Sequence, residues 1–447
     1  MSTNPDHNLL PDDLSAFWMP TTPNRKFKSD PRIMVKARGM YYTDSAGSEL
    51  LDAAAGLWCV NAGHYRPHIN EAIAAQLEEI DFAHSFNAGH PGAFRFASRL
   101  VKHFPDTLNH VFFTNSGSES VDTALKMAIA WHKARGDGSR QRLIGRQRAY
   151  HGMGFGGISV GGLVKNRSQF GPLLPGSDHI RHTHDVERNR FSRGLPAHGA
   201  ERADDLERLV ELHGAETIAA VIVEPVTGAG GVIMPPEGYL QRLRDLCDKY
   251  GILLIFDEVI TGFGRLGACS AAERFGVVPD IMTTAKGITN ATIPLGAVFV
   301  TAQIYDTFMD PEAAPGIELN HGFTYSGHPV ACAAGLATLD IYEQEGLFTR
   351  AAGLQDLWCD AALALQGEAF VDDIRCFALI GAIDLEPGST PGERGDHVGR
   401  YCYEHGVWVR NMGDTIALSP PLVITEDEIQ RVFDTIRDGI RTLPAGG

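Results

Sequence analysis

GILLIFD at 251–257 and AAVIVE at 219–224 decide the fold class, because each joins a continuous apolar run to an acidic residue. Apolar runs of this length without alternation are typical of strands that are buried on both faces, as in a parallel sheet. Open α/β sheets bind ligands outside the carboxyl ends of their strands. We therefore expect an α/β fold in which Glu224 and Asp257, at two such ends, take part in the chemistry.

Strand-like and helix-like segments alternate from about residue 61 onward. An amphipathic segment covers 68–80, a short apolar run covers 111–113, and a segment with helical period covers 118–131. This order favours repeated strand-turn-helix units, and it predicts a mostly parallel central sheet.

The pattern changes after about residue 325, where an Ala-rich helix, short strands and a helix from Glu426 predict a smaller α+β domain. The first 60 residues alternate Pro-rich turns with short apolar segments, which is typical of an arm that packs on another part of the protein. The predicted division is an arm at 1–60 that packs with the small domain, a large domain at 61–324 and a C-terminal small domain at 325–447.

The composition favours an enzyme that acts on small molecules. With 44% hydrophobic residues the chain can form a large core, which excludes disordered and collagen-like classes. A net charge of −16 disfavours binding to nucleic acid or to an anionic membrane surface. We find no apolar stretch of about 18 residues, the length of a membrane span, and no signal-peptide pattern at the start. The seven cysteines have no CxxC spacing, so we expect reduced thiols and a cytoplasmic location.

Three common motifs occur without the context that would give them meaning. Glycines at 262–267 match a dinucleotide fingerprint, but no strand leads directly into them. Residues 157–161 match a serine-hydrolase elbow, yet they lie in a Gly-rich stretch. His179, His182 and His184 lack acidic or Cys partners at metal-binding spacing, so we expect solvated loop histidines and no metal site.

The segment TNSGSESVDTALKMA at 114–128 predicts a site for an anion. Ser116, Gly117 and Ser118 follow a short strand and open a helix. The free N–H groups and the positive end of the dipole at such a helix start attract an anion. An ordinary Ser N-cap is the alternative interpretation.

Asp257 and Lys286 form the second chemical pair. The lysine lies 29 residues after the aspartate, in TTAKGITN. A buried amine loses its proton more readily and can act as a nucleophile, while the carboxylate can hold a cation. A structural ion pair between the two residues is the alternative.

Together these segments resemble the class-III (ω) aminotransferases, which are pyridoxal-phosphate (PLP) enzymes of fold type I. The resemblance covers nearly the whole chain and is greatest to the β-alanine:pyruvate branch. It is carried by motifs in this order: SGSES at 116–120, YHG at 150–152, EP at 224–225, FDEVITGFGR at 256–265, AKG at 285–287, FTYSGHP at 323–329 and WVRNMGD at 408–414.

The resemblance implies a role for each motif residue around the cofactor. Lys286 would hold the cofactor covalently and then move the substrate proton, and Asp257 would pair with the ring nitrogen. Tyr150 and Val259 would cover the two faces of the ring, the valine from the same side of an extended segment as Asp257. Glu224 would organise hydrogen bonds near the cofactor, with a salt bridge to a surface Arg or Lys as its alternative.

The resemblance further implies a phosphate site and a shared active site. The phosphate would bind at Ser116, Gly117 and Ser118. Thr324 would reach it from the neighbouring subunit, and Phe86 would complete the partner's pocket. A homodimer, alone or paired into a homotetramer, is therefore expected.

Substrate recognition by resemblance falls to Trp58 and Arg410, the latter offering a fork for a carboxylate that swings away when none is present. Ala417 is a departure, because a polar residue is expected there in the β-alanine:pyruvate branch, and its loss favours apolar amines.

The expected reaction is amino transfer from an ω-amine or ω-amino acid to pyruvate. The alternatives are specificity for taurine or for putrescine and other diamines, an aminomutase acting on a semialdehyde, and a non-catalytic PLP-binding protein.

Overall fold

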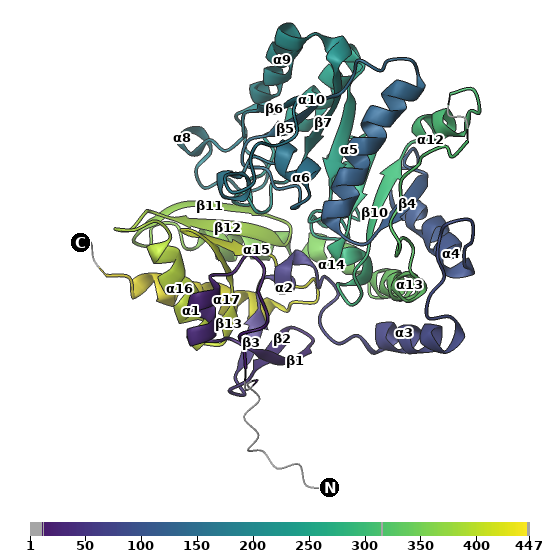
Figure 1. Ribbon diagram of the computed structural model, residues 1–447. Coiled ribbons are helices and arrows are strands. Elements are labelled where there is room, and N and C mark those ends of the chain that lie inside the picture. The colour runs from purple at the N-terminus through teal and green to yellow at the C-terminus, as the bar shows by residue number, and fades with distance from the viewer. Residues whose placement is uncertain (1–10, 12, 314–315, 445–447) are drawn as a thin grey trace.

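The computed structural model describes residue 11, residues 13–313 and residues 316–444 (Figure 1). The start of the predicted arm, residues 1–10, lies outside the described residues.

A seven-stranded sheet organises the fold. Its strands lie in the order β4 (His110–Thr114), β10 (Gly296–Val300), β9 (Ile281–Thr284), β8 (Leu253–Asp257), β7 (Ile218–Val223), β5 (Arg142–Arg146) and β6 (Ser177–Ile180). Strand β10 is antiparallel to both of its neighbours, and the remaining pairs are parallel. The predicted α/β fold with a mostly parallel central sheet is confirmed.

Both faces of this sheet are covered. Leu253 and Ile255 of β8 belong to a cluster with α5 (Gly117–Ala134) and α12 (Ala302–Met309). Leu254 and Phe256 belong to a second cluster with α10 (Tyr239–Tyr250). Successive residues of a strand point to opposite faces, so a strand between two apolar layers must be apolar throughout. This explains the uninterrupted apolar runs in the sequence.

Two smaller sheets complete the architecture. One is antiparallel, in the order β11 (Val371–Phe377), β12 (Ile380–Leu385), β15 (Thr415–Leu418) and β14 (Arg410–Met412). The other joins β1 (Met34–Arg38), β2 (Tyr41–Asp44) and β3 (Glu49–Asp52) to β13 (Val407–Trp408), which runs parallel to β3. The N-terminal strands are therefore built into the same sheet as a late strand of the chain.

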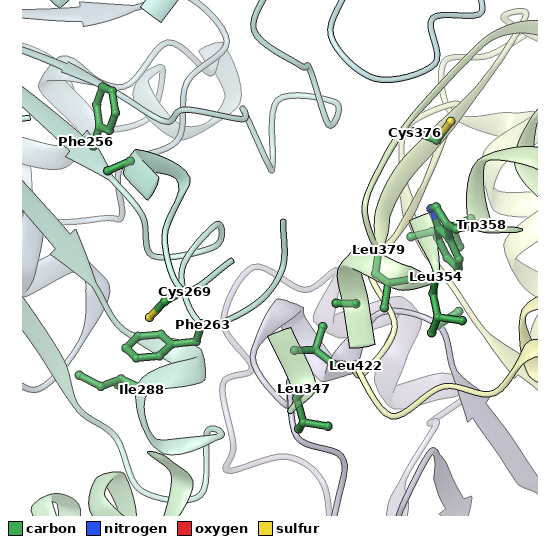
Figure 2. Packing of buried hydrophobic residues seen from close by; sticks show 14 of the residues in the cluster. Phe256, Phe263, Cys269, Ile288, Leu347, Leu354, Trp358, Cys376, Leu379 and Leu422 are labelled. Atoms are coloured by element: carbon green, nitrogen blue, oxygen red, sulfur yellow. The ribbon is translucent and has the colours of Figure 1, made fainter. Parts of the chain in front are cut away.

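The larger core cluster continues from the central sheet into the C-terminal half. Figure 2 shows Leu354, Trp358 and Leu379 grouped together, while Phe263 and Ile288 of the same cluster come from the segments that follow β8 and β9. Trp358 is fully buried. The central sheet and the antiparallel sheet thus share one apolar core.

The remaining helices surround these sheets (Figure 1). The α-helices are α1 (Asn24–Ser29), α2 (Ala55–Trp58), α3 (Pro67–Glu79), α4 (Pro91–Leu100), α6 (Phe155–Val160), α7 (Val164–Arg167), α8 (Val186–Asn189), α9 (Asp205–His213), α11 (Ala271–Phe275), α13 (Pro329–Gln344), α14 (Leu347–Gly353), α15 (Gln355–Leu363), α16 (Glu393–Glu404) and α17 (Glu426–Arg441). The 3₁₀ turns are η1 (Val101–His103), η2 (Ala200–Asp204), η3 (Ala215–Thr217) and η4 (Lys286–Thr289).

Gly145 in β5 is a position where the packing tolerates no side chain. A Cβ there would lie 1.8 Å from the carbonyl oxygen of Val160. We expect Gly145→Ala to lower the free energy of unfolding by about 1–3 kcal/mol or more, the cost of overpacking a core, as measured by the denaturant midpoint. Gly138→Ala is the matched control, because a Cβ there meets nothing within 4 Å. Equal stability of the two variants would contradict this account of the packing.

Candidate functional site

A cavity opens where β7, β8 and β9 end and α5 begins. It is lined by Ser116, Gly117, Ser118, Tyr150, His151, Gly152, Glu224, Asp257, Val259, Ile260, Ala285 and Lys286. Strands β7 and β8 are parallel and pair Val223 with Phe256. Their carboxyl ends therefore place Glu224 and Asp257 at one edge of the sheet, as predicted from the two apolar runs.

The start of α5 forms one wall of the cavity. Ser116 is the N-cap, and its Oγ accepts a hydrogen bond from the N–H of Glu119 at 3.2 Å. The Ser118 Oγ accepts one from the N–H of Met153 at 3.1 Å. The two hydroxyls thus brace the surrounding backbone, and the N–H groups of Gly117 and Ser118 lie in a first turn that has no intrahelical acceptor. The capping interpretation and the anion-site interpretation both fit this geometry.

Glycine at position 117 is required by close packing. A Cβ there would lie 2.9 Å from Cγ1 of Val259, across the same cavity. Val259 itself lies in a turn after β8, where its N–H donates to Oδ1 of Asp257 at 3.2 Å. The expectation that Val259 lies in an extended segment is therefore wrong, because the chain turns to satisfy the carboxylate. The residue nevertheless lines the cavity.

Asp257 is buried at the end of β8. Its Oδ2 lies 2.8 Å from Nδ1 of His151, and its Oδ1 accepts a hydrogen bond from the hydroxyl of Thr283 at 3.1 Å. Among the described residues the salt-bridge partner of Asp257 is His151, so the alternative of a structural pair with Lys286 is not what the geometry shows. His151 was missed as a site residue, although it adjoins Tyr150 in the YHG motif.

Lys286 follows β9 and opens the turn η4 with a left-handed φ of 52°. Its half-buried side chain borders the cavity, and burial of the amine lowers the pKa of Lys286. Nearby Cys59, Asp257 and Glu224 raise the pKa of Lys286, whereas Arg410 lowers it. Because burial is the largest influence, a neutral and nucleophilic amine is favoured here.

The carboxylate of Glu224 binds backbone N–H groups rather than a charged side chain. Its carboxylate accepts hydrogen bonds from the N–H of Tyr150 at 2.9 Å and from the N–H of Gly228 at 2.8 Å. Burial raises the pKa of Glu224. Within the described chain Glu224 forms no salt bridge with a surface Arg or Lys. Glu224 therefore fixes Tyr150, whose own pKa is raised by burial and by the charge of Asp257.

Trp58 and Arg410 meet beside Lys286. The Arg410 Cζ lies 5.3 Å from the centroid of the Trp58 ring, and the Lys286 Nζ lies 5.8 Å from it. Burial lowers the pKa of Arg410, and its Nε has no hydrogen-bond partner among the described residues. Ala417 is paired with Arg410 across β14 and β15 and packs in the same apolar cluster as Trp58. These contacts leave a half-buried cation beside an apolar wall.

Phe86 and Thr324 are not brought into the cavity. Both are exposed on the described chain, with Phe86 at 56%, and neither lines the cavity beside Lys286.

One of the three clustered histidines, His179, differs from expectation. His179 lies within β6 and is half-buried, with its Nε2 2.9 Å from the carbonyl oxygen of Gly161. The expected solvated loop is wrong at this position because β6 carries the side chain against the backbone of residue 161. No group of three or more His, Cys, Asp or Glu among the described residues could hold a metal ion.

None of the helices in the described part of the chain combines the length and the apolar character that a membrane crossing requires.

Comparison with known proteins gives concordant matches. The family described as aminotransferase class-III matches residues 24–440. The chain is similar to an ω-aminotransferase of Caulobacter vibrioides, with 58% identity over 95% of this chain and 97% of that protein. It is 47% identical to a β-alanine–pyruvate aminotransferase of Pseudomonas aeruginosa over 96% of each. A PLP-bound amine transaminase from an uncultivated Pseudomonas species superimposes with a TM-score of 0.90 at 38% identity, covering 96% of this chain and 99% of that one.

Gly152 offers a test of the anion site. A Cβ there would lie 2.4 Å from Oγ of Ser118 and 2.7 Å from its Cα. We expect Gly152→Ala to shift the start of α5 and to weaken the binding of pyridoxal phosphate about tenfold to hundredfold, the effect of losing one hydrogen bond to a charged group. Absorbance titration of the protein measures this affinity.

Gly136→Ala is the control for that substitution. Gly136 has the same φ of 87° as Gly152, but a Cβ there meets nothing within 4 Å. The backbone strain is therefore the same in both variants. An equal loss of affinity for pyridoxal phosphate in both would contradict the assignment of the anion site to the start of α5.

Proposed function

This chain belongs to the class-III aminotransferase family, and we propose that it transfers an amino group from an ω-amine or ω-amino acid, of the β-alanine type, to pyruvate. The products are L-alanine and an aldehyde or ketone. The observation that carries the proposal is the placement of Lys286 and Asp257 in one cavity, with Lys286 and Arg410 both facing the ring of Trp58. The similarity to the ω-aminotransferase and β-alanine–pyruvate aminotransferase relatives supports it.

The cofactor is pyridoxal 5'-phosphate, and the residues of the cavity fit it. When bound, this group supplies an aldehyde that accepts the amino group and a ring that withdraws electrons from the substrate carbon. The N–H groups of Gly117 and Ser118 suit the phosphate, because they combine free donors with the positive end of the α5 dipole. Asp257 suits a protonated ring nitrogen, since the carboxylate is buried and already oriented by His151 and Thr283.

Tyr150 and Val259 flank the space between these two anchors. Glu224 holds the backbone of Tyr150, and the N–H of Val259 is held by Asp257. Each flanking residue is thus oriented by a carboxylate of the site. We assign them to the two faces of the cofactor ring.

Lys286 is assigned two duties. A neutral amine would hold the cofactor covalently and, once displaced by the substrate amine, would take a proton from the substrate carbon and pass it to the cofactor carbon that had carried the aldehyde oxygen. Both duties require the deprotonated form, which the burial of Lys286 favours. Asp257 would pair with the ring nitrogen of the bound cofactor, and a carboxylate beside that nitrogen favours its protonated form.

Substrate selection is assigned to Trp58, Arg410 and Ala417. A guanidinium in a mostly buried setting gains most from a carboxylate that pairs with it, as pyruvate or an ω-amino acid would. Trp58 supplies a flat wall beside it. The methyl group of Ala417 offers no hydrogen bond, so apolar amines are favoured as donors over short polar amino acids.

The assembly is proposed to be a homodimer or a tetramer of such dimers. Phe86 and Thr324 are exposed on the described chain and do not line its cavity, which supports their contribution to the partner's site. We retain the division into an arm (1–60), a large domain (61–324) and a small domain (325–447).

Location and partners complete the proposal. The seven cysteines are free, and six of them are buried, which supports a reducing, cytoplasmic setting. The net charge of −16 supports small-molecule partners without nucleic acid.

Amino transfer is tested by separate addition of the two substrates. Stoichiometric amounts of β-alanine or 1-phenylethylamine are added to the holoenzyme, then pyruvate, with alanine quantified at the end. We expect the donor to bleach the cofactor absorbance and pyruvate to restore it with one alanine formed per site. Bleaching by taurine or putrescine alone would reassign the donor, and an unresponsive absorbance with every donor would indicate a non-catalytic PLP-binding protein.

Lys286→Ala should reduce steady-state turnover by roughly 10³-fold or more, because the variant loses both the covalent anchor and the proton carrier. The phosphate donors are backbone groups, so cofactor should still bind noncovalently. Alanine formation and equilibrium dialysis measure the two properties. Lys165→Ala, an exposed lysine of α7, is the control, and wild-type turnover in Lys286→Ala would refute the mechanism.

Asp257→Asn should slow the donor half-reaction roughly 10²- to 10³-fold, the magnitude associated with breaking a buried charge pair. A neutral amide cannot stabilise a protonated ring nitrogen. Stopped-flow absorbance measures the rate of bleaching, with Asp245→Asn on the exposed side of α10 as control. Near-normal bleaching would mean that another group holds the ring.

A further inference from the structure

The segment that carries Trp58 has a strained backbone. Ala55, Gly56 and Trp58 adopt positive φ values of 46°, 64° and 58°. For residues with a side chain the left-handed region costs roughly 1–2 kcal/mol each. Such strain persists only where the surroundings over-determine it, and it is concentrated at functional sites. Some other part of the protein must therefore hold this segment in place.

The indole of Trp58 makes no polar contact within the described chain that would hold the strained segment in place. Trp58 is buried, and its Nε1 has no hydrogen-bond partner among the described residues. Its neighbours are apolar side chains and the cations Lys286 and Arg410. The position of the ring is thus set by the course of its own backbone.

Asp52 fixes that course. Its side chain is fully buried at the end of β3, where Oδ1 accepts a hydrogen bond from the N–H of Ala54 at 3.0 Å. Oδ2 accepts one from the N–H of Gly56 at 2.7 Å and lies 2.8 Å from Nε2 of His64. Three donors therefore converge on one carboxylate; one of them, the N–H of Gly56, lies within the strained segment, and the N–H of Ala54 directly precedes it.

Residues next to Asp52 and His64 connect them to the strand that leads to Arg410. The N–H of Ala53 donates to the carbonyl oxygen of Trp408 at 2.9 Å, and the carbonyl oxygen of Ala53 accepts from the N–H of Ser419 at 2.8 Å. His64 packs against Tyr42, with ring centroids 4.3 Å apart. The Asp52 carboxylate thus sits where the chains bearing Trp58 and Arg410 meet.

We infer that the buried Asp52–His64 pair is a positioning pair that fixes the Trp58 wall and thereby sets how large an amine the site accepts. This inference rests on the proposed function. Neither residue contacts the cavity around Lys286. The pair acts through the Trp58 backbone, and loosening it frees the indole to move away from Lys286.

Asp52→Asn is the substitution of choice, since it keeps the shape of the side chain. An amide has one acceptor oxygen and one NH₂ group, so one of the two N–H donors of Ala54 and Gly56 must face another donor. His64→Leu removes the third donor instead and serves as the second variant. His64→Gln, which can still donate to the carboxylate, is the conservative rescue.

The experiment compares the kcat/KM values of a small donor, isopropylamine, and a bulky donor, 1-phenylpropylamine, with pyruvate as acceptor. We expect Asp52→Asn and His64→Leu each to shift the ratio about fivefold or more toward the bulky donor, in the direction of Trp58→Ala, and His64→Gln to shift it less than twofold. In the Trp58→Ala background, Asp52→Asn should move the ratio less than twofold, because coupled residues are not additive. An equal shift with and without Trp58 would overturn the inference.

A second readout does not depend on amino transfer. Hydrogen exchange followed by mass spectrometry should show faster exchange in peptides covering 53–60 of Asp52→Asn, with peptides covering 116–124 unchanged. Unchanged exchange at 53–60 would overturn the positioning role even if the enzyme is active. Faster exchange at 53–60 in a protein that transfers no amino group would instead support the positioning of Trp58 and reject the proposed function.

Discussion

The carboxylate of Asp257, held between His151 and Thr283 at the end of a strand buried on both faces, is the constraint around which the site is arranged. A buried carboxylate is costly unless it is paired. The imidazole and hydroxyl donors offset that cost, and the turn after β8 adds the N–H of Val259. The opposite wall is the start of α5, whose Gly117 must lack a side chain to approach Val259. These hydrogen bonds and the close packing of Gly117 therefore fix the space between Asp257 and α5. Lys286 enters that space from the end of the neighbouring strand.

Much of this arrangement could be predicted from the sequence because it is recorded locally. The apolar runs before Glu224 and Asp257 predicted two buried strands, and the structure shows that these strands are parallel neighbours whose ends meet. The segment of Ser116, Gly117 and Ser118 predicted a helix start, which the structure places at Gly117. The order of motifs supplied the family, which the match over residues 24–440 confirms.

What could not be predicted depends on pairings between distant segments. His151 adjoins Tyr150 in the sequence, but only the fold shows that it contacts Asp257, 106 residues away. The course of the chain after Asp257 was expected to be extended, whereas the carboxylate accepts the N–H of Val259, two residues on, and the chain turns there. No sequence pattern indicates the role of Asp52, because its partners include backbone N–H groups whose direction depends on positive φ values. Phe86 and Thr324 do not line the cavity of their own chain, and their proposed role in a partner's site involves a second chain, which no periodicity within one chain reports.

The central claim is that one lysine, Lys286, forms the covalent link to the cofactor in the cavity beside Asp257. Reduction of the pyridoxal-phosphate-loaded protein with borohydride, followed by proteolysis and mass spectrometry, traps this link and locates it. The account predicts one modified peptide per chain, the one that contains Lys286, and loss of the modification in Lys286→Ala. Modification of a different lysine, or a reconstituted protein that carries no covalent cofactor, would contradict it.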